Sequence, residues 1–164
     1  ADNVWGTTDT ASEAYQAAGN WVGVLFAVQA IGSGLWAMVL PMFKRMKVGY
    51  SVSLVLGAAG FISTYFIHDQ YLLFISFILI GCGWAAMLSM PFALLTNALS
   101  GSNSMGAYLG LFNCTICLPQ IIAALIGGVL LKMVGGEQIM MLVVAGVSLL
   151  LGAVAVIGIQ TKKA

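Results

Sequence analysis

The sequence predicts an all-α, polytopic helical membrane protein with five transmembrane helices. Of its 164 residues, 61% are hydrophobic and only 7% are charged, whereas soluble domains carry about 25% charged residues. The apolar runs are long and continuous, unlike the alternating segments of a membrane β-barrel. Because a helix needs roughly 20 apolar residues to cross the hydrocarbon core, the chain has room for five or six crossings.

The chain opens with a polar, acidic stretch over residues 1–18. This stretch lacks the basic region and short apolar core of a signal peptide, and residue 1 is Ala rather than Met. We interpret 1–18 as a truncated external loop and 19–164 as a transmembrane bundle. We expect the chain to be a fragment of a longer protein whose earlier spans precede it.

Hydropathy places the five spans near residues 19–43, 51–67, 71–99, 105–131 and 138–159. Residues 70–131 contain no charged side chain, and we divide them at 99–106, where Gly, Ser and Asn cluster as in a turn. The third span would rise about 45 Å as a straight helix. We therefore expect it to tilt, to kink at Pro91 or to protrude from the bilayer.

The charged residues support an odd number of spans, because Lys and Arg favour the cytoplasmic side. Lys132 is the one basic residue that this layout places outside. The other five follow the first or the fifth span: Lys44, Arg45, Lys47, Lys162 and Lys163. The acidic residues all fall on the opposite side: Asp2, Asp9, Glu13, Asp69 and Glu137. We expect an external N-terminus and a cytoplasmic C-terminus in the cell (inner or plasma) membrane.

Polarity differs between the spans. The second and fifth are mostly aliphatic and small, which is typical of outer, supporting helices. The fourth carries a continuous small or polar stripe: Gly106, Gly110, Asn113, Cys117, Gln120, Ala124 and Gly127. This stripe fits either a close helix–helix seam or the wall of a cavity, because buried amides need hydrogen-bond partners.

Two other spans carry groups suited to a polyhydroxylated ligand. The first aligns Phe26, Gln29, Ser33 and Trp36, although Trp36 is equally typical of an interfacial anchor. The third places Trp84 well away from the small stripe that contains Ser89, so we expect these two residues on different faces.

The sequence lacks the residues that enzymes, metal sites and nucleic-acid-binding proteins need. His68 is the only histidine, it lies in an expected external loop, and there is no HExxH motif, so we expect no enzymatic activity. Cys114 and Cys117 form a CxxC without further ligands, and we interpret them as packing residues. No metal or cofactor is expected, and the lack of a basic patch argues against binding to nucleic acid.

Three groups of motifs carry a family resemblance. They are Gly6–Asp9 with Gly19–Gly23, Gly81–Ala85 with Pro91–Leu94, and Gly106–Asn113 with Pro119–Gln120. In this order they resemble the sucrose- and maltose-type sugar:cation symporters of the major facilitator superfamily. The resemblance covers nearly the whole chain and matches the C-terminal half, spans eight to twelve, of a twelve-span protein.

The resemblance implies a partial major facilitator fold that transports a sugar, a disaccharide, by proton-coupled alternating access. The partners would be the sugar, H⁺, the lipid bilayer and the missing N-terminal half of the same transporter. No Asp or Glu lies inside a span, so the carboxylate that handles the proton would belong to that half. The expected substrate-binding residues are Gln29, Asn113 and Gln120, followed by Asn20, Trp36, Trp84 and Ser89.

Two alternatives remain open at the level of the sequence. The first is another major facilitator symporter, for glycosides, hexuronides or other small solutes. The second is a non-transporting membrane scaffold subunit whose polar stripes bind partner helices.

Overall fold

The computed structural model describes residues 2–101 and 104–158, which contain helices and no strand. In chain order the helices are α1 (Asp2–Trp5), α2 (Glu13–Val39), η1 (Leu40–Met42), α3 (Met46–Phe66), α4 (Leu73–Ala98), α5 (Met105–Met133) and α6 (Gln138–Gly158). Helices α2 to α6 are the 5 that are long and apolar enough to cross a membrane. The predicted all-α class with five spanning helices is confirmed.

Two of these helices begin earlier than hydropathy indicates. Helix α2 starts at residue 13 rather than 19, because Ser12 caps it and accepts a hydrogen bond from the Tyr15 amide. Helix α3 starts at residue 46 rather than 51 and carries Lys47 in its first turn. The stretch interpreted as a loop over residues 1–18 therefore includes α1 and the first six residues of α2, since polar residues extend a helix beyond its apolar part.

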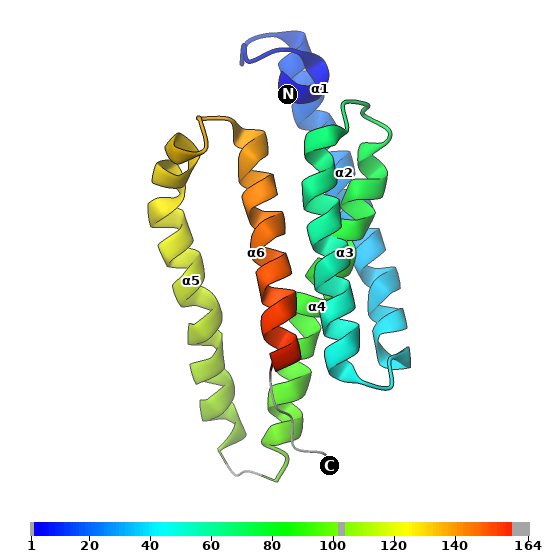
Figure 1. The fold of residues 1–164 in the computed structure, drawn as a ribbon, viewed down its shortest axis with the longest axis vertical. Coiled ribbons are helices and arrows are strands. Elements are labelled where there is room, and N and C mark those ends of the chain that lie inside the picture. The colour runs from blue at the N-terminus through cyan, green and yellow to red at the C-terminus, as the bar shows by residue number, and fades with distance from the viewer. Residues whose placement is uncertain (1, 102–103, 159–164) are drawn as a thin grey trace.

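Successive spanning helices run in opposite directions (Figure 1). One end of the bundle, here called the acidic end, holds the connections that contain Asp69 and Glu137, together with the start of α2. The opposite, basic end holds Lys44 and Arg45 between α2 and α3. The remaining basic residues expected at that end, Lys162 and Lys163, lie outside the described residues.

Helix α3 lies at the centre of the bundle and packs against both α4 and α6, while α2 packs against α4. A Cβ added to Gly57 of α3 would lie 3.0 Å from the Cα of Gly83 of α4. A Cβ at Gly60 would lie 2.6 Å from the backbone oxygen of Ser76. Within the described chain the second span is thus a central helix, although its composition predicts an outer support, because its small residues admit backbone-to-backbone packing.

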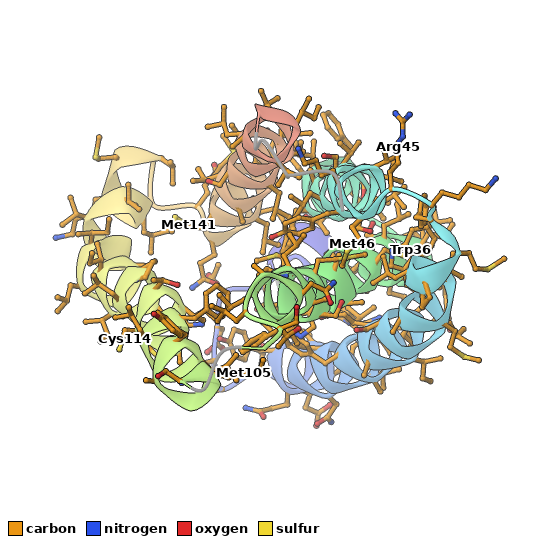
Figure 2. The ribbon with its side chains drawn as sticks, turned by 90° about the horizontal axis from the view of Figure 1, so that it is seen from below. Trp36, Arg45, Met46, Met105, Cys114 and Met141 are labelled. Atoms are coloured by element: carbon orange, nitrogen blue, oxygen red, sulfur yellow. The ribbon has the colours of Figure 1, made fainter. Side chains whose placement is uncertain are left out.

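Helix α5 lies at the edge of the bundle, beside α6 and away from α2 and α3 (Figures 1 and 2). It has no buried residue. A ring contact joins it to α4, with the centroids of Phe92 and Phe112 5.0 Å apart. Cβ atoms added at Gly106, Gly110 or Gly127 would meet nothing within 4 Å, so the small stripe of α5 forms no helix seam within the described chain.

An aromatic cluster ties α2 to α4 at the acidic end. The Trp21 indole N–H donates a 3.1 Å hydrogen bond to the Gln70 carbonyl oxygen. The Trp21 ring also contacts Tyr71 and Phe74, with centroids 5.5 and 5.3 Å away. Aromatic residues with a polar atom concentrate where a bilayer meets water, which fits this cluster at the end of the spans.

Candidate functional site

A pocket of about 520 Å³ opens between α2 and α4, and we call it the α2–α4 pocket. Helices α3 and α6 complete its wall, and α5 contributes no lining residue. It is lined by Phe26, Gln29, Ala30, Ser33, Phe61, Phe77, Ile80, Trp84, Leu88 and Leu142. Site volumes of roughly 300–1,000 Å³ are typical of small-molecule ligands.

Helical periodicity and two glycines place these side chains together. Residues 26, 29, 30 and 33 follow one face of α2, and 77, 80, 84 and 88 follow one face of α4. Between these faces, a Cβ at Gly81 would lie 2.5 Å from the Gln29 carbonyl oxygen, and a Cβ at Gly32 would lie 3.2 Å from the Ile78 Cα. The two helices therefore touch at their backbones beside the pocket.

The pocket combines two polar groups with several aromatic rings. Neither the Gln29 amide nor the Ser33 hydroxyl has a hydrogen-bond partner among the described residues, and both are half-buried. Trp84 is 49% exposed, and Phe26 meets Phe77 edge-on with ring centroids 6.1 Å apart. No lining residue is charged. An amide, a hydroxyl and aromatic faces suit a neutral ligand with many hydroxyl groups.

Of the predicted site residues, the structure brings Gln29 and Trp84 together in this pocket. Trp36 is engaged elsewhere: its indole N–H donates a 2.8 Å hydrogen bond to Ser53 Oγ, which is fully buried. The Trp36 ring packs on the buried cluster of Leu40, Ala85, Ala86 and Met90. The described geometry gives Trp36 a role in joining α2 to α3.

Two further predicted residues lie outside the pocket lining. The Ser89 hydroxyl donates a 2.7 Å hydrogen bond to the Ala85 carbonyl of its own helix. Trp84 lines the pocket and Ser89 does not, which agrees with their predicted positions on different faces of the helix. Asn20 is exposed near the acidic end of α2.

The predicted residues on α5 are separate from the pocket. Asn113 and Gln120 are exposed, and neither lines it. Cys114 and Cys117 are free and exposed, so the described chain does not bury either of them as the packing interpretation expects. The first, third and fourth spans were expected to line one cavity. The first and third, α2 and α4, line the pocket, whereas the fourth, α5, does not.

Sequence reasoning missed several lining residues for different reasons. Phe77 precedes Trp84 by two helical turns, and this spacing alone was sufficient to find it. Phe61 and Leu142 come from the spans interpreted as outer supports. Which side of those apolar helices meets the pocket is fixed by tertiary packing, and no local pattern marks it.

Among the described residues, no group of three or more His, Cys, Asp or Glu side chains is placed to hold a metal ion. Comparisons of the chain with protein-family models, with curated proteins and with solved structures find no significant match.

Proposed function

We propose that this chain forms part of a membrane transporter for a neutral sugar, a disaccharide, and that the α2–α4 pocket contacts the sugar. The observation that carries the proposal is the pocket itself. Between helices long enough to span a membrane, the polar groups of Gln29 and Ser33, which have no hydrogen-bond partner in the described part of the chain, lie beside four aromatic rings. Such a site offers hydrogen bonds to hydroxyl groups and an apolar surface to the C–H face of a sugar ring.

Each polar group has a distinct role in the proposed complex. The Gln29 amide both donates and accepts, so it suits a hydroxyl group that does the same. Ser33, one turn further along α2, suits a second hydroxyl, and the half-exposed Trp84 ring provides the stacking surface. The absence of a charged lining residue favours a neutral sugar over a hexuronide, whose carboxylate needs a cationic partner.

The rest of the pathway is assigned to a second helical half. The exposed stripe of α5, with Asn113 and Gln120, would face that half, and the two halves would rock to give alternating access. If H⁺ is the coupling ion, its carboxylate belongs to the second half, because α2 to α6 carry no Asp or Glu beyond the first turn of α2. In this arrangement the basic end is cytoplasmic and the acidic end is external.

Uptake of a radiolabelled disaccharide by cells that express the complete protein tests this function. We expect Gln29→Leu and Trp84→Ala to raise the apparent KM by about fivefold or more, since each removes a contact of about 1 kcal/mol. Gln138→Leu is the matched control, because Gln138 is exposed at the acidic end outside the pocket. An unchanged KM in both pocket variants contradicts the assignment.

A membrane scaffold is the second candidate function, and the exposed small stripe of α5 favours it. Small residues allow close approach of another helix, and the glycines of this stripe have open space beside them. A scaffold would show no sugar uptake, and its binding to a partner helix would be weakened by Gly110→Leu.

A further inference from the structure

A second hollow lies between α3 and α6 and shares no lining residue with the α2–α4 pocket. This α3–α6 groove has a volume of about 350 Å³ and is lined by Ser51, Val52, Val55, Leu56, Leu150, Ala153, Val154 and Ile157. Its one polar side chain is occupied, because the Ser51 hydroxyl donates a 3.3 Å hydrogen bond to the Ala153 carbonyl. Val154 and Ile157 are 69% and 70% exposed, so the groove opens to the outside of the bundle.

Three basic residues come shortly before the groove-lining residues of α3 in the sequence. Lys47 is one helical turn before Ser51 on α3, and Lys44 and Arg45 come directly before α3. Figure 2 shows Arg45 pointing outward from the start of α3. The described Asp and Glu side chains lie at the other end of the bundle, and none is paired with these three residues. The groove therefore ends one helical turn from Lys47, whose charge no described acidic residue compensates.

The groove covers about two thirds of the hydrocarbon depth of one leaflet of a bilayer. On α6 it extends from residue 150 to residue 157, a rise of about 10 Å. The hydrocarbon part of one leaflet is about 15 Å thick. A chain seated in the groove would therefore begin near the basic end and run toward the middle of the membrane.

We propose that the α3–α6 groove binds one anionic phospholipid. An acyl chain lies against the aliphatic wall formed by residues such as Val55 and Val154, and the phosphate lies among Lys44, Arg45 and Lys47. The combination selects this occupant: an aliphatic chain fills a groove without free polar groups, and the negative headgroup complements the charge. A partner helix is less suited, because bulky Val, Leu and Ile side chains form the rim in place of small residues. The proposal does not depend on sugar transport.

Native mass spectrometry of the complete, delipidated protein in detergent tests this inference. Phosphatidylglycerol and phosphatidylcholine with identical acyl chains are the two probes. We expect one phosphatidylglycerol to bind preferentially. Replacing Lys44, Arg45 and Lys47 by Gln should reduce that preference by about fivefold for each charge removed. Lys132→Gln is the matched control, since it removes a charge from α5 at the acidic end and should leave the preference unchanged.

A second set of variants tests the acyl chain. Val154→Trp fills the groove from an exposed position, and we expect it to reduce retention of both phospholipids. Val52→Phe serves the same purpose from α3 if the first variant fails to fold. Equal binding of the two lipids to the unaltered protein overturns the proposal. So does a preference that survives removal of the three charges, or retention that survives both groove variants.

Discussion

Gly81 of α4 lies so close to Gln29 of α2 that a Cβ at position 81 would be 2.5 Å from the Gln29 carbonyl oxygen. The same Cβ would be 2.9 Å from the backbone nitrogen of Ser33. Both of these α2 residues line the α2–α4 pocket. The contact between two helix backbones therefore sets the position of the polar groups that we assign to the sugar.

Gly81→Ala should push α2 away from α4, because the added methyl group meets backbone atoms that cannot rotate aside. Overpacking of this kind costs about 1–3 kcal/mol, so we expect a lower midpoint of thermal unfolding in detergent. Gly23→Ala is the control, since a Cβ there meets nothing within 4 Å. Equal midpoints for the two variants would show that α2 and α4 do not touch at Gly81.

Trp36→Phe should weaken the contact between α2 and α3. The variant loses the hydrogen bond to Ser53, while the Ser53 hydroxyl keeps its 2.7 Å bond to the Gly49 carbonyl. Hydrogen bonds between membrane helices contribute about 0.6 kcal/mol on average. A double-mutant cycle with Ser53→Ala, measured by unfolding, should yield a coupling free energy of this size between the two residues. The sugar affinity of Trp36→Phe should be unchanged. A coupling of zero would exclude the hydrogen bond.

In the isolated chain of residues 1–164, Gly110→Ala on α5 should leave stability unchanged or raise it, because Ala favours a helix over Gly by about 1 kcal/mol and a Cβ at this position meets nothing within 4 Å. Gly57→Ala on α3 should lower it, since the added Cβ would lie 3.0 Å from the Gly83 Cα. Thermal unfolding of the two variants side by side makes the comparison. A larger loss for Gly110→Ala would mean that α5 packs against a neighbour.

The sequence was sufficient to predict the fold class and the five spans, because the free energy of burying apolar residues in a bilayer depends on local composition. The packing order was not predictable in the same way. Glycines lie at close helix–helix contacts on α3 and α4 but beside open space on α5. Only the tertiary arrangement distinguishes Gly57, which contacts a neighbouring helix, from Gly110, which does not. Gln29 and Trp84, predicted as sugar contacts from their residue types, both line the α2–α4 pocket, and their contact with a sugar stays a prediction. Phe61 was missed because tertiary packing alone turns its side of α3 toward the pocket.

The most direct test of the proposed sugar site is protection of Gln29→Cys from alkylation. The variant is made in the complete protein, with Cys82, Cys114 and Cys117 replaced by Ala, and is treated with a polar maleimide. We predict that a transported disaccharide slows labelling in a saturable manner, while Asn20→Cys, exposed outside the pocket, reacts at the same rate with and without sugar. Labelling of Gln29→Cys that is unaffected by any disaccharide would contradict the account.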